Sequence, residues 1–460
     1  MNNKNDKKKW ILFVSIITSF VTTFIGSALN LSIPQIEENF NVSAQEVNWT
    51  ITIYMLTCGA LAVPFGKIGD IINRKLILCV GLLLFSISSI FSIFSNSLNG
   101  LVAYRFIQGV GAAMIFSANI AILLSSTSKD ERGKLLGYST GANYVGLSAG
   151  PVVGGFLNNS FGWKSIFIIT AAISLVAFCS AVIKVPREEK SNKTKYALFS
   201  LDWKGVILYV TSICLIMYGL SSLGSLVYSK YLFFVGIASF IIFFKYEIKK
   251  EKPILNVRYY MGNKAHTCSN LAAFFNYGAV FAASYLVSIY LQIVRGYSST
   301  LAGIILVAAP VVQAFFSPIA GKMADKHTPQ LISSIGAFLC AISLFALSFV
   351  DLESSIIYLI CILMLEGLGC AVFSSPNSSA VMSSIAKEDY GVASSVLSTM
   401  RSIGHTTSMA VVTLIMDVYV GKIKMNDATT QILMESIQIC LYVFTAWCII
   451  GFFMALKRKS

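Results

Sequence analysis

The sequence predicts an all-α integral membrane protein, and three observations support this prediction. Hydrophobic residues make up 56% of the 460 residues and charged residues only 12%, whereas a soluble globular protein carries about 25% charge. The apolar residues form many separate runs of roughly 20 residues, the length that crosses a hydrocarbon core. These runs do not alternate as the strands of a membrane β-barrel do. In lipid they must therefore be helices, which satisfy their own backbone hydrogen bonds.

The apolar runs predict fourteen transmembrane helices. The polar interruptions at 184–202 and 245–264 are the longest between them. We expect an N-terminal six-helix bundle at 1–183, two central linker helices at 184–264 and a C-terminal six-helix bundle at 265–460. The helices are predicted at 10–30, 46–66, 76–96, 98–124, 134–157, 163–183, 203–222, 229–246, 265–293, 299–320, 330–350, 355–384, 391–418 and 433–456.

An internal repeat supports this division into two bundles. The second predicted helix ends in Pro64-Phe65-Gly66-Lys67-Ile68-Gly69-Asp70, and the tenth ends in Pro318-Ile319-Ala320-Gly321-Lys322-Met323-Ala324-Asp325. Both segments read Pro-x(1–2)-Gly-Lys-x-(Gly/Ala)-Asp, each on the second helix of a six-helix block. Paired bundles of this kind are how many membrane carriers are built.

The distribution of basic residues predicts the orientation. With the N-terminus inside, 28 of the 35 Lys and Arg residues fall in cytoplasmic segments, as the positive-inside rule requires. We therefore expect a multi-pass protein of the plasma membrane with both termini in the cytoplasm. The net charge of +14 then belongs to the cytoplasmic face and does not indicate a nucleic-acid partner. The basic stretch at 1–9 leads into a first helix, without the small-residue cleavage site of a secretory signal.

Neither an enzyme active site nor a metal or cofactor site is expected. The ten cysteines lie singly in apolar runs without a CxxC pair, so they are interpreted as small hydrophobic residues. The three histidines, at 266, 327 and 405, are scattered. No Gly-x-x-x-x-Gly-Lys-Ser/Thr loop for nucleotide binding occurs.

Three motifs give the chain a specific resemblance. The segment Gly66–Lys75 resembles the loop 2–3 signature of the major facilitator superfamily, and Arg105–Ala113 resembles its helix-4 motif. Gly137, Gly146, Gly150, Pro151, Gly154 and Gly155 are similar to its helix-5 antiporter motif. The resemblance implies the major facilitator fold, two six-helix bundles plus two extra central helices, in the fourteen-helix drug:proton antiporter branch.

The loop after the second helix is a candidate gate. Asp70, Arg74 and Lys75 can make charge-assisted contacts to helix ends at the cytoplasmic mouth, and such contacts can form in one conformation and break in the other. Gly66, Gly321 and Asp325 belong to the same repeated motif. The alternative is an ordinary basic turn. Ile71 and Asn73 stand where the family usually has Arg and Gly, which predicts a weaker gate.

The predicted fifth helix carries glycines at every fourth position. Gly146, Gly150 and Gly154 form a flat stripe that lets another helix approach closely, and Pro151 removes one backbone hydrogen bond and permits a bend. The functional interpretation places the stripe where two bundles rock and where a tight seal resists proton leak. The alternative is ordinary helix packing.

Arg105 lies about seven residues into its helix, roughly 10 Å deep at 1.5 Å per residue. A charge at that depth indicates a function or a partner. The family resemblance would place an Asp in the first helix to pair with it, but that position is Ile25 and the first helix has no acid. The usual proton-coupling pair is therefore absent.

Glu366 is the candidate replacement. It lies roughly 16 Å into its helix, close to the midplane, where burial suits reversible protonation. Arg401 reaches a similar depth from the opposite side, so a Glu366–Arg401 contact is expected, either as part of proton coupling or as a structural ion pair. His405, one turn beyond Arg401, can titrate near neutral pH or simply be packed.

Polar amides and aromatic rings inside the predicted spans are candidates for lining a substrate cavity. The amides can equally bond neighbouring helices, and the rings can face lipid or hold planar cations. The amides are Asn30, Asn143, Asn276, Gln292, Gln313 and Asn377, and the rings are Tyr54, Tyr144, Phe274, Phe275, Tyr277 and Tyr285.

The sequence thus predicts a secondary active exporter with alternating access. Inward flow of protons would drive efflux of amphipathic small molecules or drugs, a basis for antibiotic resistance, by a monomer in the lipid bilayer. The first alternative is an exporter of an endogenous metabolite or a non-cationic compound. The second is a membrane-embedded sensor that does not transport.

Overall fold

The computed structural model describes residues 2–42, 44–186, 201–222, 228–419 and 430–457, and this part of the chain is helical, without a β-strand. Twelve of the helices described are long and apolar enough to cross a membrane. The all-helical membrane fold predicted from hydropathy is confirmed, whereas the count of fourteen spans is not supported.

Among the described residues, the first group of helices, here called the N half, holds seven main helices, four short elements and the π-helical turn η3 (Gly150–Gly154). Its apolar core is continuous from Ile11 to Val185 and draws on each of the long helices. The main helices are α1 (Asn2–Ala28), α4 (Trp49–Ile71), α5 (Arg74–Ile93), α6 (Leu98–Ser125), α7 (Arg132–Ala149), α8 (Gly155–Phe161) and α9 (Lys164–Lys184); the short elements are η1 (Leu29–Ser32), α2 (Ile33–Phe40), α3 (Ala44–Val47) and η2 (Lys129–Glu131).

The second group, here called the C half, has its own core, which extends from Ala279 to Cys448. The helices are α14 (Lys264–Ile289), α15 (Ser299–Leu306), α16 (Ala308–Lys326), α17 (Pro329–Leu347), α18 (Ile356–Ser383), α19 (Tyr390–Tyr419) and α20 (Thr430–Leu456), with the shorter η4 (Tyr290–Val294) and η5 (Lys387–Asp389). Two further helices, α11 (Trp203–Ser221) and α12 (Ser229–Ile248), form a central pair followed by the short α13 (Val257–Gly262).

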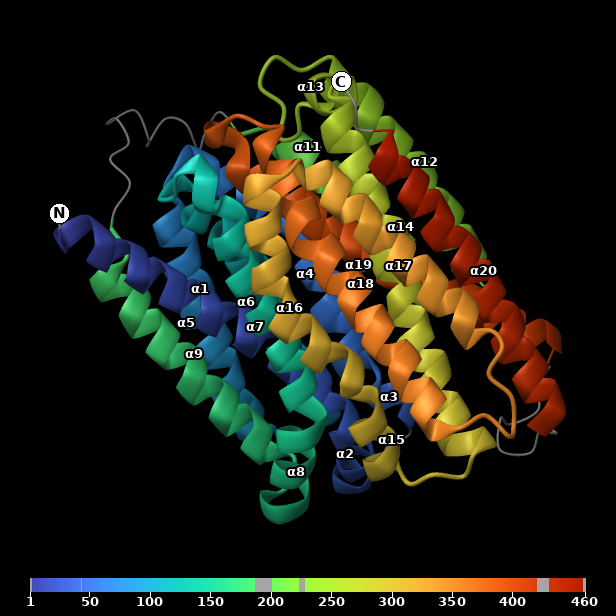
Figure 1. Cartoon of the computed structure of the whole chain (residues 1–460). Helices are drawn as coiled ribbons and strands as arrows, with labels where there is room; N and C mark the ends of the chain where they lie inside the picture. Colours follow the sequence, from blue (N-terminus) through green and yellow to red (C-terminus); the bar gives the residue numbers. More distant parts are fainter. Residues whose placement is uncertain (1, 43, 187–200, 223–227, 420–429, 458–460) are drawn as a thin grey trace.

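A third apolar cluster joins the halves. It combines residues of α4, α6 and α7 with residues of α18 and α19, and it includes Tyr209 and Phe243 of the central pair. The two halves and the central pair are therefore packed together at one end of the molecule. In Figure 1 the first turn of α1 and the last turn of α20 lie toward this same end, where α13 also lies.

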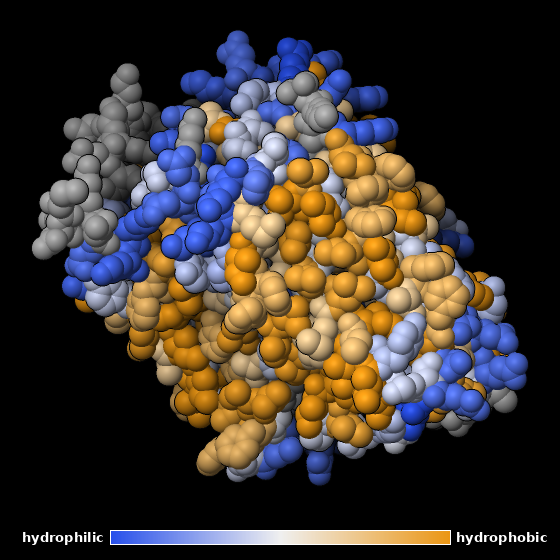
Figure 2. All heavy atoms as spheres, in the orientation of Figure 1, coloured by the Kyte–Doolittle hydropathy of each residue, from blue (hydrophilic) through white to orange (hydrophobic). Residues whose placement is uncertain are grey.

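Figure 2 shows apolar side chains covering the middle of the molecule, with polar side chains gathered at its two ends. This distribution suits a protein surrounded by hydrocarbon with water on either side. Helix α12 illustrates it, since Phe234, Val235, Ile241 and Ile242 are exposed large apolar residues on that one helix.

Two predicted helices are present but are not among the twelve candidate spans. Helix α7 ends at a π-helical turn, η3 (Gly150–Gly154), which contains Pro151, and α19 carries serines, threonines, an arginine and a histidine along its length. Both helices lie between the halves: α7 packs on α16, and α19 packs on α4. Because protein rather than lipid covers these faces, their composition is more polar than that of the other helices.

Candidate functional site

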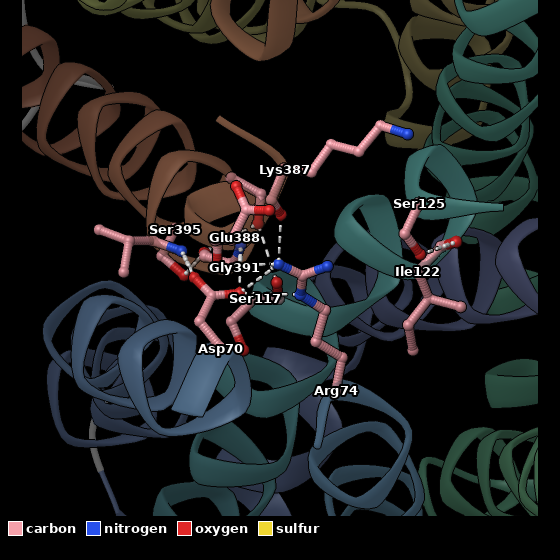
Figure 3. Close-up of polar contacts among 11 residues, drawn as sticks. Asp70, Arg74, Ser117, Ile122, Ser125, Lys387, Glu388, Gly391 and Ser395 are labelled. Carbon is pink, nitrogen blue, oxygen red and sulfur yellow. Dashed lines mark hydrogen bonds and ion pairs between the residues drawn. The ribbon is translucent and has the colours of Figure 1, made fainter. Parts of the chain in front are cut away.

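The carboxylate of Asp70 joins the end of α4 to the start of α19, in the opposite half. Its Oδ1 accepts a hydrogen bond from the Gly391 amide at 2.9 Å, and its Oδ2 accepts one from the Val392 amide at 2.9 Å (Figure 3). The first amides of a helix have no partner within the helix, and the helix dipole favours a negative charge beside them. We call this contact the first latch.

Arg74 extends the first latch. Its Nε donates to Asp70 Oδ1 at 2.8 Å, and its Nη2 lies 2.7 Å from the same oxygen. Nη2 also donates to the carbonyls of Lys387 and Glu388, at 2.6 and 3.0 Å, in the segment that leads into α19 (Figure 3). Both side chains of the ion pair are at least 95% buried. The ion pair is therefore bonded on both sides of the boundary between the halves.

The repeated motif builds a second latch on the other side of the interface. Asp325, at the end of α16, accepts hydrogen bonds from the Gly133 amide at 2.5 Å and from the Lys134 amide at 2.8 Å. These amides belong to the first turn of α7. The position that corresponds to Arg74 is Pro329, so the second latch has the capping carboxylate without the arginine.

Glycines let the backbones touch at both latches. A Cβ added to Gly133 or Gly321 would overlap the carbonyl of the other residue. A Cβ added to Gly391 would come within 2.6 Å of Asp70 Oδ1 and 2.7 Å of the Gly66 carbonyl. Contacts this close leave no room for a side chain, so the glycines of the repeated motif set the approach of the two halves.

The residues that receive the aspartates form a second internal repeat, which sequence reasoning missed. The segments Lys129-Asp130-Glu131-Arg132-Gly133 and Lys387-Glu388-Asp389-Tyr390-Gly391 both read Lys-acid-acid-x-Gly. Each makes a turn of 3₁₀-helix followed directly by α7 or α19. The residues at the x positions, Arg132 and Tyr390, lie against each other, with the Arg132 guanidinium 5.6 Å from the centre of the Tyr390 ring. A search of the sequence for this pattern would have found both acceptor sites.

Lys75, predicted as part of the gate, has a different role. Its Nζ donates to the carbonyls of Val182 and Val185, at 2.8 and 2.5 Å, at the end of α9. A lysine suits the negative end of a helix dipole. The contact stays within the N half, so it is separate from the latches.

The predicted glycine stripe on the fifth helix divides into two parts. Gly137 faces the C half, where an added Cβ would lie 2.5 Å from the Ser317 carbonyl and 2.7 Å from Pro318 Cα. Gly146, Gly150 and Gly154 instead face Phe20, Ser27 and Ala28 of α1, within the N half. The expectation that this stripe lies between the two bundles is therefore wrong for these three glycines in this conformation, which agrees with the packing alternative.

Pro151 lies inside the π-helical turn η3, and Gly155 begins α8. Proline has no amide proton and clashes with the carbonyl four residues back, and π turns commonly accommodate such interruptions of a helix. A local change of helix type thus lies at the position where the sequence predicts a bend.

Arg105 of α6 is fully buried and has no acidic partner among the described residues. Its Nε donates to the Thr50 carbonyl at 2.9 Å, and its Nη1 bonds Gln108, whose Nε2 donates to Ser89 Oγ at 2.7 Å. The guanidinium also lies 4.2 Å from the centre of the Tyr54 ring. Ile25 is completely buried, so an apolar side chain fills the position of the missing acid.

Glu366 is buried within α18, and neither carboxylate oxygen has a hydrogen-bond partner in the described part of the chain. The thiols of Cys370 and Cys448 lie near enough for the charge of Glu366 to act on them. An uncompensated carboxylate in such surroundings is costly, and protonation removes the cost. The residue therefore has the environment of a proton acceptor.

The expected contact between Glu366 and Arg401 is not formed. The Arg401 guanidinium instead lies 4.4 Å from the centre of the Tyr277 ring, and its Nη2 lies 3.4 Å from the Tyr277 hydroxyl. Its buried Nε has no partner among the described residues. His405 stacks on Phe281 with ring centres 4.4 Å apart. Equal depth in the two helices did not determine which way the side chains point.

Tyr144, one of the aromatic residues predicted as candidates for lining a cavity, connects the two halves near Arg401. Its hydroxyl lies 2.5 Å from Ser374 Oγ of α18, in the opposite half. The Arg401 guanidinium and the Tyr277 hydroxyl both lie close enough to the Tyr144 hydroxyl to interact with it electrostatically. These groups come from α7, α14, α18 and α19, so they form a polar and aromatic cluster between the halves.

The predicted cavity amides have separate surroundings. Asn276 Nδ2 lies 3.9 Å from Cys448 Sγ, and Asn377 Nδ2 donates to the Ser269 carbonyl at 3.3 Å. The Asn143 backbone carbonyl accepts from Thr23 of α1, while its side-chain Oδ1 has no partner among the described residues. Gln292 of η4 bonds Ser288 of α14 at 2.8 Å. Gln313 is buried in α16. The side chain of Asn30 lies outside the described residues.

Comparison with known proteins agrees with this architecture. The family model of the Major Facilitator Superfamily matches residues 15–409 and 269–459. The riboflavin transporter RibZ of Clostridioides difficile is 29% identical over 88% of this chain and 87% of its own length. The multidrug transporter protein MdtP of Bacillus subtilis is 26% identical over 91% of this chain and 77% of its own length.

Among solved structures, the human organic anion transporter MFSD10 shares the fold, with a TM-score of 0.72 and 14% sequence identity over 97% of this chain and 99% of that one. Fold and family thus rest on different kinds of comparison that agree with each other. The chain is a multi-pass membrane transporter that belongs to the Major Facilitator Superfamily.

Proposed function

We propose that the protein is a proton-coupled antiporter that exports amphipathic small molecules from the cytoplasm by alternating access. The observation that carries this proposal is the pair of latches. Each latch holds a carboxylate of one half against the helix N-terminus of the other, by contacts that must break if the halves separate at that end. The basic residues of the neighbouring segments favour the cytoplasm for the latched end, so this conformation would be closed to the cytoplasm.

The moving units would be the two six-helix halves at 1–183 and 265–460, linked by the central pair at 184–264. If α7 with α8 and α19 are counted with the twelve candidate spans, the chain has the fourteen membrane helices of the drug:proton antiporter branch. Glu366 would carry the proton, since it is buried and has no hydrogen-bond partner among the residues that the structure describes. Multidrug transporters among the relatives support export of drugs.

Substrate would bind at the cluster formed by Tyr144, Tyr277, Ser374 and Arg401. Arg401 offers a cationic guanidinium whose Nε has no partner in the described part of the chain, and the rings offer flat apolar faces. This chemistry favours the second candidate function, export of a metabolite or another non-cationic, planar compound that accepts hydrogen bonds. A relative named as a riboflavin transporter supports the same class of substrate.

Everted membrane vesicles test the proposal. Adding substrate to vesicles with an imposed pH gradient should dissipate the gradient in wild type, and Glu366→Gln should abolish that response while Glu353→Gln, at an exposed loop acid, leaves it intact. A screen that includes riboflavin, planar anions and lipophilic cations separates the two substrate classes. Full proton-driven efflux by Glu366→Gln contradicts the assignment of Glu366, and absence of flux for every compound favours the sensor alternative.

A further inference from the structure

A buried pair of carboxylates lies in the central helix pair, outside the latches and outside both halves. Asp202 directly precedes α11, and Glu247 lies near the end of α12. The Asp202 side chain is 7% exposed, and Glu247 is 2% exposed. The proposed export mechanism uses neither residue, and both were missed by sequence analysis because they lie at the ends of apolar runs.

One oxygen of each carboxylate is hydrogen-bonded. Asp202 Oδ1 caps α11 by accepting from the Gly205 amide at 3.2 Å, and it accepts from the Tyr246 hydroxyl at 3.0 Å. Glu247 Oε2 accepts from the Leu255 amide at 3.1 Å, which ties α12 to the segment that follows it. These bonds fix the orientation of both carboxylates.

The remaining oxygens, Asp202 Oδ2 and Glu247 Oε1, are buried and have no hydrogen-bond partner within the described residues. Both oxygens face Gly205: a Cβ added there would lie 2.9 Å from Asp202 Oδ2 and closer still to Glu247 Oε1. Because Gly205 has no side chain, both oxygens lie beside the same small space on its α-carbon.

Two like charges in this position repel each other, and the nearby cations offset only part of that repulsion. The Lys250 amine is 4.0 Å from Asp202 Oδ1, and its side chain is 42% exposed. Lys67 of α4 is the other cation whose charge reaches Glu247. Tyr246 is the remaining titratable group in contact with the pair.

We propose that Asp202 and Glu247 form a proton-binding site that holds one proton between Asp202 Oδ2 and Glu247 Oε1. A proton needs only these two oxygens, whereas Mg²⁺ or Ca²⁺ takes six or more oxygen ligands. Among the described residues no group of three His, Cys, Asp or Glu side chains is placed to hold a metal.

Lys67, which follows Gly66 in the gate motif, would link the site to the first latch through its charge. A movement of α4 on opening of the latch would carry Lys67 with it and would change the proton affinity of the pair. By linkage, the protonation state of the pair then shifts the equilibrium of the latch by the same free energy. This consequence for transport rests on the proposed function, whereas the proton site itself does not.

Infrared spectroscopy of the purified full-length protein tests the site directly. A pH titration should show a carbonyl band of a protonated carboxylic acid that disappears in Glu247→Gln and changes its titration in Asp202→Asn, a variant that keeps the helix cap. Gly205→Ala inserts a methyl group between the oxygens and should shift the titration without changing any charge. Glu366→Gln is the control for a buried carboxyl elsewhere and should leave this band unchanged.

The same band with the same midpoint in wild type, Glu247→Gln and Asp202→Asn would overturn the proposal. Elution volume and thermal melting report whether each variant folds, and Gly205→Ala together with Asp202→Asn decides the question if Glu247→Gln does not fold. If the band behaves as expected while vesicles show no proton-coupled efflux, the proposed function fails and the proton site remains. Proton-coupled efflux without the band means that the proton site is wrong and that the proposed function remains.

Discussion

The two latches share one design and differ in how much supports it. In both, an aspartate at the end of a helix accepts hydrogen bonds from two first-turn amides of a helix in the other half. Only the first latch adds Arg74, which bonds the aspartate and two carbonyls across the boundary. The capping aspartate, which both latches share, therefore holds the two halves together. Arg74 stabilises the closed conformation further at the first latch only.

The largest difference is expected between Asp70→Asn and Asp325→Asn. Removing one partner of a buried ion pair costs about 3–5 kcal/mol, and Asp70→Asn leaves Arg74 buried without its carboxylate. Asp325→Asn removes charge-assisted hydrogen bonds alone, at about 1.5–3 kcal/mol. Distances between one spin label on each half measure the closed population, which should fall more for Asp70→Asn. Equal losses would mean that Arg74 adds nothing to closure.

The glycines test what the latches have in common. Gly133→Ala and Gly391→Ala each place a methyl group against backbone or carboxylate atoms of the opposite half, and overpacking of this kind costs about 1–3 kcal/mol. We expect both variants to favour the open state by similar amounts in the same spin-label measurement. Gly262→Ala, at an open position on α13, is the control. A closed population unchanged by both latch variants would contradict the close approach of the backbones.

Arg74→Lys tests the arginine alone. Lysine keeps the positive charge but cannot bond the carboxylate and two carbonyls with a planar fork. We expect a loss of closed population smaller than that of Asp70→Asn, about 1.5–3 kcal/mol for hydrogen bonds to a charged group. The second latch supplies the comparison, because it closes without an arginine. An effect as large as that of Asp70→Asn would show that the hydrogen-bond geometry, more than the charge, stabilises the first latch.

The sequence predicted the aspartates of both latches but not their acceptors. Asp70 and Asp325 are visible because the motif is repeated, whereas the amides of Gly133, Lys134, Gly391 and Val392 are backbone groups present in any residue but proline. The Lys-acid-acid-x-Gly repeat is the signal that would have located them. It required comparing the two halves with each other.

Hydropathy located the helices well and counted spans less well. All the predicted ranges coincide with helices, yet α7 and α19 are not among the candidate spans because they face protein and carry small polar residues. The prediction of a Glu366–Arg401 contact was wrong for a related reason. Sequence position gives depth along a helix, while the direction of a side chain around the axis depends on tertiary packing.

The smallest expected effect concerns Glu131, which lies in the turn before α7 and so belongs to the second latch only. The Lys8 amine bonds its carboxylate, and this bond, with help from Ser128, holds the pKa of Glu131 below its usual range.

A lowered pKa means that the contribution of this pair to stability is present above the unfolded-state pKa and is lost as the pH falls through the folded-state pKa. Lys8→Ala should therefore lower the melting temperature slightly at neutral pH and not at strongly acid pH, where protonation of Glu131 removes the pair from wild type as well. Thermal melts of wild type and Lys8→Ala across the acid range measure this, with Lys7→Ala as the matched control. The side chains are partly exposed, Lys8 to 28% and Glu131 to 46%, so solvent screening keeps the effect small. A loss as large as that of Asp325→Asn would mean that the N-terminus of α1 helps to hold the second latch closed.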